Sequence, residues 1–420
     1  MKIEIVPNAS RNPIQEGWVR LTENDFNNFE SFFAKHPNIT PESVDEIVVR
    51  GVLEVHPYPL IIVRHIDWLL KSGGSFSIES LFRWDKAGYV SPYYQIRYLI
   101  TQGFKDRIIC TKIEQRDGLQ ILNYEKIKSS LPSSDTIKKW SFGICSNGSQ
   151  NERVMRLIES IAKQNIPEFE IIVCGPAPFK DLPSYVKVVD DAECYMKGDV
   201  RIPIAKKKNL IAKHAKYNNM CIMHDRYLFS DDWYKNMIKY GNYYDVITMK
   251  CYDVDKPEQE MPSINIIGSN SANVHSLKNI RLQTFDFPQD IYINGGFIIA
   301  KKHIYEHIPI PIHLNWAEAE DIVWCSKLPI NGVLIGIDEH NSVYSYTVRI
   351  ASKMVGKEKF LDKIRERYRL LRDELHSTIE WASCFNVPYK NAHFYNLRAK
   401  EFVMHVTFYM CKGINKLLLK

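Results

Sequence analysis

A polar triplet at the end of an apolar run has the clearest capacity for chemistry in this sequence. The run NMCIM leads directly into His224, Asp225 and Arg226, so a buried strand would deliver all three at its carboxyl end. One carboxylate beside an arginine holds a hard divalent cation poorly. Two interpretations stay open. Asp225 binds Mg²⁺ or Mn²⁺ together with a later group such as His340, or Arg226 itself neutralises an anion through paired hydrogen bonds.

Two other polar segments suit an anionic or planar ligand. The loop SNGSQ begins with Ser146 and Asn147 and is rich in small residues, which lets backbone groups approach a flat base. A predicted helix opens with Lys207, Lys208 and Asn209, where cationic side chains and free N–H groups can hold phosphate. The alternatives are an ordinary strand-to-helix turn and a solvated basic face.

A pair of acidic residues lies at another predicted helix start. Glu320 and Asp321 occur in NWAEAEDIVWCSKL, where the helix dipole favours negative charge, so simple capping is one interpretation. The other is that one carboxylate acts as a general base and removes a proton from a hydroxyl group.

The elements that must position these residues alternate between strands and helices. Short apolar runs predict strands at 140–146, 169–175, 186–190 and 219–225. Helical spacing of apolar residues predicts helices between them, at 151–165 and 205–217. This alternation is typical of an α/β fold with a mostly parallel sheet, in which ligands bind at the carboxyl ends of the strands.

Four segments in this order resemble family 2-like glycosyltransferases of the GT-A fold, a Rossmann-like nucleotide-sugar-binding domain. They lie between residues 140 and 346 and read SFGICSNGSQNERVMRLIESIAKQNIPEFEIIVCG, KKKNLIAKHAKYNNMCIMHDRYLFSDDWYKNM, INGGFIIAKK and WAEAEDIVWCSKL. The resemblance aligns His224–Arg226 with the family's Asp-x-Asp motif, which holds ribose and a divalent cation that bridges the two phosphates. Only the middle carboxylate, Asp225, is present here.

The resemblance also implies roles for the other candidates. Asp190, or its neighbour Asp191, would read the base or ribose. Lys207, Lys208 and Asn209 would face the donor. Gly295 and Gly296 would let the sugars approach the backbone closely. Independently of the resemblance, Trp316 is expected either to stack on a sugar ring or to pack in the core. Glu320 and Asp321 match the family's Glu-Asp pair, and we expect Asp321 to be the general base of an inverting reaction.

The first 128 residues resemble a class I S-adenosylmethionine methyltransferase. The similar segments are ESVDEIVVRGVLEVHPYP, HIDWLLKSGGSFSIES and PYYQIRYLITQGFKDRI. Val6, Pro7 and Asn8 stand where the family has a Gly-x-Gly loop, and the acid after the second strand is missing unless Glu23 or Asp25 replaces it. The resemblance therefore implies a degenerate domain that binds no S-adenosylmethionine, and KSSLPSSD (128–135) is predicted to be a linker.

Composition and the C-terminal region bound the partners and the compartment. Lys plus Arg exceed Asp plus Glu by 55 − 49 = 6 over 420 residues, which suits an anionic ligand but does not demand nucleic acid. Nine cysteines without a CxxC pair, together with the absence of a signal peptide, predict free thiols in the cytoplasm. Residues 351–420 are predicted to be helical, with a basic, aromatic end that fits either the inner membrane surface or a second subunit.

These patterns predict a domain order of 1–128, 136–350 and 351–420. The implied function is transfer of a sugar, expected from a UDP donor, to a hydroxyl of a glycan or lipid-linked acceptor in bacterial O-antigen or capsule synthesis. The alternatives are a sugar nucleotidyltransferase and a non-catalytic scaffold of a glycan-synthesis complex.

Overall fold

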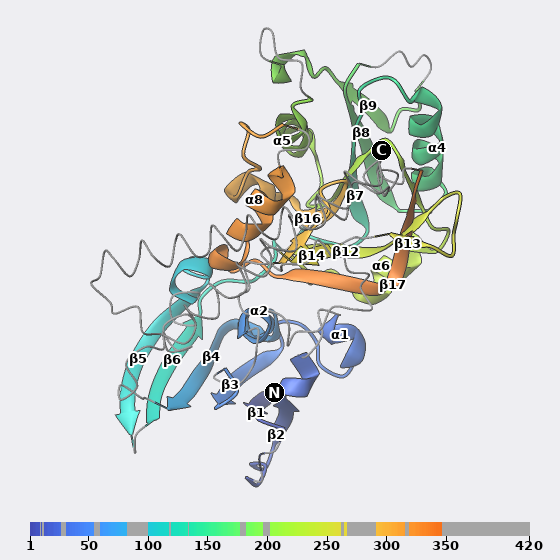
Figure 1. Ribbon diagram of the computed structural model, residues 1–420. Helices are drawn as coiled ribbons and strands as arrows, with labels where there is room; N and C mark the ends of the chain where they lie inside the picture. The colour runs from blue at the N-terminus through green and yellow to red at the C-terminus, as the bar shows by residue number, and fades with distance from the viewer. Residues whose placement is uncertain are drawn as a thin grey trace, which may run out of the picture. The chain divides into compact units, whose positions relative to one another are not determined.

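The computed structural model (Figure 1) describes most of the chain up to residue 346. The described residues are 1–8, 10, 12–26, 31–53, 59–81, 100–116, 119–132, 134–176, 182–195, 202–261, 264–266, 291–315 and 319–346. Met1–Tyr346 forms one compact unit and Thr347–Lys420 a second. The helices predicted for 351–420 lie outside the described residues.

The N-terminal part is built on a six-stranded sheet with the order β2-β1-β3-β4-β6-β5. Its strands are β1 (Lys2–Val6), β2 (Trp18–Thr22), β3 (Val44–Arg50), β4 (Leu70–Leu81), β5 (Ile108–Arg116) and β6 (Leu119–Lys126). The first four are parallel, and β6 runs antiparallel between β4 and β5. A parallel sheet that ends in such an inserted strand fits the methyltransferase-like resemblance of this segment.

The central sheet has the order β11-β17-β12-β16-β10-β7-β8-β9, with β13 paired to β12. Its strands are β7 (Lys139–Cys145), β8 (Glu168–Cys174), β9 (Val186–Val189), β10 (Asn219–His224), β11 (Tyr227–Phe229), β12 (Val246–Asp253), β13 (Glu260–Met261), β16 (Phe297–Lys301) and β17 (Ile335–Ser345). A separate pair is β14 (Ile264–Ile266) with β15 (Ile291–Ile293). Strands β9, β8, β7 and β10 are parallel and β16 is antiparallel, which is a GT-A-like arrangement. The predicted fold class is confirmed.

Helices connect and cover these strands. They are α1 (Phe32–Lys35), α2 (Pro59–Leu69), α4 (Asn151–Ala162), α5 (Ile204–His214), α6 (Trp233–Tyr240), α7 (Lys302–His307) and α8 (Glu320–Lys327), with short turns η1 (Glu23–Phe26), η2 (Ala192–Cys194) and η6 (Pro329–Asn331). Helix α4 shows how the sequence dictates the packing: Val154, Leu157, Ile158 and Ile161 recur at helical spacing and all four are buried. The predicted central strands and helices are thus confirmed, to within a few residues at their ends.

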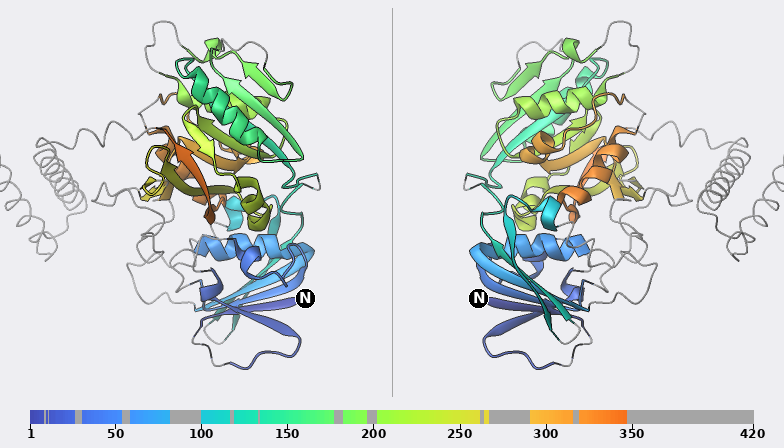
Figure 2. Two further views of the ribbon diagram at one scale, coloured as in Figure 1. Left: turned by 90° about the vertical axis from the view of Figure 1, so that its right-hand side faces the viewer. Right: turned by 90° about the vertical axis from the view of Figure 1, so that its left-hand side faces the viewer.

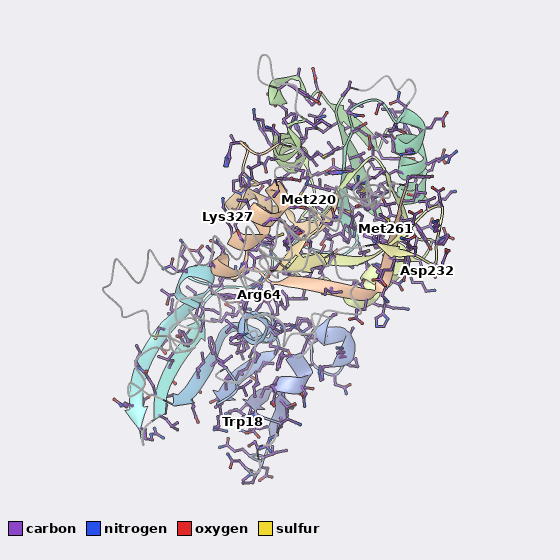
Figure 3. The ribbon with its side chains drawn as sticks, viewed as in Figure 1. Trp18, Arg64, Met220, Asp232, Met261 and Lys327 are labelled. Atoms are coloured by element: carbon purple, nitrogen blue, oxygen red, sulfur yellow. The ribbon has the colours of Figure 1, made fainter. Side chains whose placement is uncertain are left out.

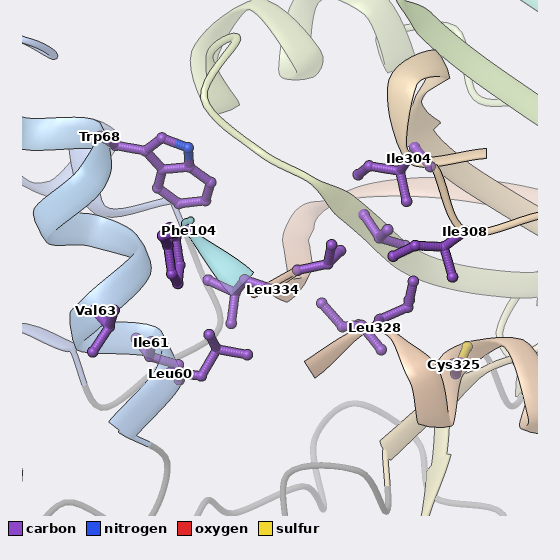
Figure 4. Packing of buried hydrophobic residues seen from close by; sticks show 14 of the residues in the cluster. Leu60, Ile61, Val63, Trp68, Phe104, Ile304, Ile308, Cys325, Leu328 and Leu334 are labelled. Carbon is purple, nitrogen blue, oxygen red and sulfur yellow. The ribbon is translucent and has the colours of Figure 1, made fainter. Parts of the chain in front are cut away.

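One hydrophobic cluster runs from the N-terminal part into the central part, and a second lies within the central part. Helix α2 lies between the N-terminal sheet and the central elements (Figure 2), and buried residues of both parts belong to one cluster. In Figure 4, Leu60 and Phe104 face Leu334 and Leu328 across this seam. Two glycines approach very closely there, because a Cβ added to Gly103 would lie 2.6 Å from the Cα atom of Gly332.

A buried charge network crosses the same seam. Arg64 of α2 donates from Nε and Nη2 to the two carboxylate oxygens of Asp245, at 2.7 and 2.6 Å (Figure 3 labels Arg64). Arg64 also pairs with Asp67, which accepts from Arg107 Nε at 3.1 Å. Asp245 accepts the backbone N–H of Leu334 as well, at 2.9 Å. A bidentate pair of this kind fixes both distance and orientation between the elements that carry it.

The segment predicted as a linker is packed and hydrogen-bonded. Ser129 Oγ donates to both carboxylate oxygens of Glu42, and the Ser130 N–H donates to Glu42 Oε1 at 2.6 Å. Asp135 accepts from Lys301 Nζ at 2.9 Å, where burial lowers the pKa of that lysine to about 8 despite the nearby carboxylate. The segment joins β6 to β7 without a helix or strand in its described residues, and its hydroxyl and carboxylate groups have fixed partners; that it separates two domains stays a prediction.

The loop after β1 has the features expected of a degenerate methyltransferase-like site. The two acids considered as replacements bond to the chain itself: Glu23 accepts the backbone N–H of Asn8, and Asp25 accepts that of Thr22 at 2.7 Å. Pro7 stands in the loop, with Cγ 3.9 Å from where a Cβ on Gly51 would lie. These residues do not fit S-adenosylmethionine, and that the domain binds none stays a prediction.

The cysteines and the helix lengths give two further observations. All seven cysteines in the described part of the chain are free thiols, and only Cys110 among them is exposed. Within that same part, no helix combines the length and apolar character that crossing a bilayer requires.

Candidate active site

A pocket opens where the central strands β7 and β10 end beside helix α5. Its volume is about 290 Å³. Its lining comprises Cys145, Ser146, Asn147, Ile202, Ile204, Lys207, His224, Asp225 and Arg226. Six of these nine residues are predicted site residues, so the structure brings the SNGSQ loop, the helix lysine and the polar triplet together. The reason is that β7 and β10 are parallel neighbours whose carboxyl ends meet at one sheet edge.

Asp225 is held in place by the loop after β7. Ser146 Oγ donates to Asp225 Oδ2 at 3.0 Å and in turn accepts the N–H of Gly148 at 3.1 Å. Burial raises the pKa of Asp225, although the Ser146 hydrogen bond and the charge of Arg226 act in the opposite direction. The carboxylate therefore lies at the pocket wall with one oxygen already engaged.

Lys207 lines the pocket, and its positive charge is balanced by a nearby carboxylate. Its Nζ donates to the backbone oxygen of Ser146 at 2.8 Å and pairs with Asp191 Oδ2 at 2.5 Å. Burial opposes the charge of Lys207, but its pKa is raised because Asp191 stabilises the cation. Asp190 is exposed and accepts the N–H of Ala192 in its own turn. The structure thus brings Asp191, rather than Asp190, to the predicted phosphate-binding lysine.

A second cluster surrounds the start of α8. Lys208 is fully buried and donates from Nζ to the Gly295 backbone oxygen at 2.7 Å and to Glu320 Oε1 at 3.0 Å. Asn209 exchanges two hydrogen bonds with the backbone of Ile310, at 2.7 and 3.0 Å. Lys208 and Asn209 therefore have positions inside the protein scaffold, and neither lines the pocket.

Asp321 is the second carboxylate of this cluster. Its Oδ2 accepts the N–H of Gly295 at 2.8 Å, and its Oδ1 accepts the N–H of Ile322 at 3.0 Å. Helix α8 begins after Ala319, whose φ of 61° turns the chain so that both acids occupy the first helical turn. Among the described residues Asp321 has no cationic partner, whereas Glu320 is paired with Lys208.

The Gly295–Gly296 turn joins the two clusters. A Cβ on Gly295 would lie 2.9 Å from Asp321 Cβ, and one on Gly296 would lie 3.0 Å from Arg226 Nη2. The N–H of His224 also donates to the Gly296 backbone oxygen at 2.9 Å. A Cβ on Gly296 would also lie 2.7 Å from Tyr227 Oη, so a side chain at either glycine would crowd its neighbours, and Asp321 and Arg226 contact the two residues of one turn.

The structure separates the two residues considered as metal ligands. His340 is exposed and lies in another pocket, between α1, α6 and β17, which Asp338 and Lys239 also line. It sits in a bulge of β17, because the pairing with β12 shifts by several residues after Met249. Within the described ranges, no three His, Cys, Asp or Glu side chains gather as a metal site. Asp225 and His340 therefore line different pockets, and that a divalent cation binds at Asp225 stays a prediction.

Some of the site was missed or cannot be placed. Trp316 lies outside the described residues. Sequence reasoning missed Cys145, Ile202 and Ile204, which line the pocket with apolar atoms. The only signal was the apolar pair in RIPIAKKK next to the basic cluster, and its pattern equally fits a buried helix start.

Comparisons with known proteins found similarities among solved structures. No family model matches the chain, and no curated protein matches it. A crystal structure of S. aureus TarS (1–349) in complex with UDP-GlcNAc aligns at 17% identity and a TM-score of 0.34, covering 64% of this chain and 73% of that chain. The inositol-1-phosphate CTP transferase from T. maritima aligns at 11% identity and a TM-score of 0.31, covering 49% and 88%.

A putative type 11 methyltransferase from Sulfolobus solfataricus is also similar, at 12% identity and a TM-score of 0.20, covering 28% of this chain and 64% of that chain. The first title names a complex with UDP-GlcNAc, and the second names a CTP transferase. At these TM-scores the likenesses identify neither the donor nor the reaction of the present chain.

Proposed function

We propose that this protein is a glycosyltransferase that moves a sugar from a UDP-sugar donor to a hydroxyl group, with inversion at the anomeric carbon. The observation that supports the proposal is the Gly295–Gly296 turn, since a Cβ on Gly295 would meet Asp321 and a Cβ on Gly296 would meet Arg226 of the pocket lining. A group-transfer enzyme needs this juxtaposition, because the leaving group and the base must lie on opposite sides of one reacting carbon.

Each residue has a chemical role in this proposal. The nucleotide occupies the pocket beside Ser146 and Asn147, and its diphosphate leads from there toward the glycine turn. Asp321 accepts the proton of the acceptor hydroxyl as the oxygen attacks the anomeric carbon, and the bond to the diphosphate breaks. The N–H of Gly295 holds Asp321 Oδ2 at 2.8 Å and so orients the carboxylate. Glu320 and Lys208 position this turn from inside the protein.

The finer features of the proposal concern the acceptor and the place of action. We infer a glycan or lipid-linked acceptor of bacterial O-antigen or capsule synthesis, and action in the cytoplasm at the inner face of the membrane. What supports this is the basic, aromatic sequence of the C-terminal region, including Arg398, Lys412 and Lys420, which suits an anionic surface.

Donor turnover tests the proposal. The protein is incubated with a panel of UDP-sugars, and free UDP is measured with wild type and Asp321→Asn. We expect Asp321→Asn to lower UDP release by about 100- to 10,000-fold, since a general base contributes that much, while UDP binding by calorimetry is unchanged. Asp232→Asn is the matched control, because Asp232 is an exposed residue directly before α6, and this variant should retain full turnover.

Two outcomes would count against the proposal. Full turnover by Asp321→Asn would remove the assigned base. Release of pyrophosphate from UTP and a sugar 1-phosphate, without turnover of any UDP-sugar, would instead establish the nucleotidyltransferase alternative.

A further inference from the structure

Arg226, a positively charged residue, lies next to Asp225, the residue considered above as a metal ligand. Asp225 is the one carboxylate among the described residues of the pocket lining, and its Oδ2 accepts the Ser146 hydroxyl at 3.0 Å. Its neighbour along the chain is Arg226, which lines the same pocket. A divalent cation prefers several oxygen ligands, and a guanidinium next to its site repels it.

Arg226 is half-buried and has hydrogen-bonding capacity left over, in contrast to Lys207, the buried cation of the pocket. Its Nε is buried without a hydrogen-bond partner among the described residues. Lys207, by comparison, is already paired with Asp191 and with the Ser146 backbone oxygen. An unpartnered guanidinium N–H is costly to bury, so an anion that binds here would satisfy it.

The side chain of Arg226 also lies at the right place for the diphosphate. Its Nη2 is the atom that a Cβ on Gly296 would approach to 3.0 Å, on the turn whose other glycine contacts Asp321. Arg226 therefore stands between the nucleotide pocket and the general base. A diphosphate that links a nucleoside in this pocket to a sugar near Asp321 must pass this point.

We propose that Arg226 takes the place of a divalent cation and neutralises the diphosphate of the donor, so that donor binding requires no metal. The inference rests on the proposed function and specifies its cofactor requirement. The planar guanidinium offers two parallel N–H groups to phosphate oxygens, which a lysine or a glutamine cannot reproduce. As the UDP group departs, the same contacts stabilise the negative charge that it gains.

The test measures UDP and uridine binding by calorimetry, in EDTA and in Mn²⁺. Wild type should bind UDP equally in both, and more tightly than uridine. Arg226→Gln should lose about 10- to 100-fold in UDP affinity, the range for hydrogen bonds to a charged group, and keep its uridine affinity, which also shows that the pocket is intact. Arg226→Lys should fall between the two. Lys213→Gln removes an exposed charge from the same helix as Lys207 and should change neither affinity.

Arg226→Asp provides a second measurement, because it restores two adjacent carboxylates. Its UDP affinity should be low in EDTA and rise with Mn²⁺. The inference is overturned if wild-type UDP binding needs Mn²⁺ as much as that of Arg226→Asp, or if Arg226→Gln keeps the full preference for UDP over uridine. If wild type binds neither UDP nor uridine in either buffer, the proposed function fails together with the inference.

Discussion

Removal of Asp245 tests whether the buried charge network holds the N-terminal and central parts together. Asp245→Ala would leave Arg64 with Asp67 as its remaining carboxylate partner and would leave the N–H of Leu334 without its acceptor. Breaking a buried ion pair by removing one partner costs about 3–5 kcal/mol, and the remaining Asp67 contact argues for about 3 kcal/mol here. That is a large part of a typical unfolding free energy of about 5–15 kcal/mol.

The assay is equilibrium unfolding in urea, followed by tryptophan fluorescence. Asp232→Ala is the matched control, since Asp232 pairs with Lys235 at 3.6 Å on the surface, where both side chains are 68% exposed, and should cost less than about 1 kcal/mol. A double variant with Arg64→Met and Asp245→Leu should lose less stability than the sum of the single changes, because it leaves no unpaired charge at this pair. If Asp245→Ala costs no more than Asp232→Ala, the network does not stabilise the fold.

The same carboxylate makes stability depend on pH. Burial acts to raise the pKa of Asp245, but the charge and hydrogen bonds of Arg64 outweigh it and lower the pKa below its usual value. The folded state therefore releases this proton more readily than the unfolded state. Its contribution is present at neutral pH and is lost as pH falls below the ordinary range for aspartate, and Asp245→Asn should flatten this acid-side slope.

Two further changes have opposite expected signs. Burial raises the pKa of Asp338 to about 6, so the folded state disfavours its charged form and stability falls as pH rises from the ordinary aspartate range through 6. Asp338→Asn should therefore raise the unfolding free energy at pH 7.5 by up to about 3 kcal/mol. An unchanged unfolding free energy would contradict the assigned burial penalty. Gly103→Ala would place a methyl group 2.6 Å from the Cα atom of Gly332 and should lower the unfolding free energy by about 1–3 kcal/mol in the same urea assay. Gln102→Ala, at the exposed neighbouring residue, is the control and should have no comparable effect.

The central fold was predictable because its signals are local. Apolar runs such as NMCIM and EIIVC form strands β10 and β8, and the spacing of Val154 and Leu157 forms α4. Once parallel neighbours are recognised, the meeting of Ser146 with Asp225 follows from sheet geometry alone.

The partners of the charged residues were not predictable, because they come from distant parts of the chain. The sequence around Lys208 is typical of a phosphate ligand at a helix start. In the structure, however, Lys208 forms an internal ion pair with Glu320, which is 112 residues away. Arg64 and Asp245 are separated by 181 residues, and no local pattern marks either as half of a pair.

The surroundings of His340 and of the predicted linker were not predictable for other physical reasons. The position of His340 depends on a bulge in β17, and a shift in register moves every following side chain. The composition of KSSLPSSD is that of a mobile connector, but serine hydroxyls bind a carboxylate as readily as they bind water, and Glu42 supplies one.

The contact between Gly103 and Gly332 has a consequence for how this chain can change. The two backbones touch with no room for a side chain, and Arg64 and Asp245 interlock beside them. An exchange of the first half for a homologous segment would have to supply a matching glycine and a matching guanidinium at once. We therefore expect a replacement of the N-terminal part to be tolerated only when it also supplies matching residues at these two contacts.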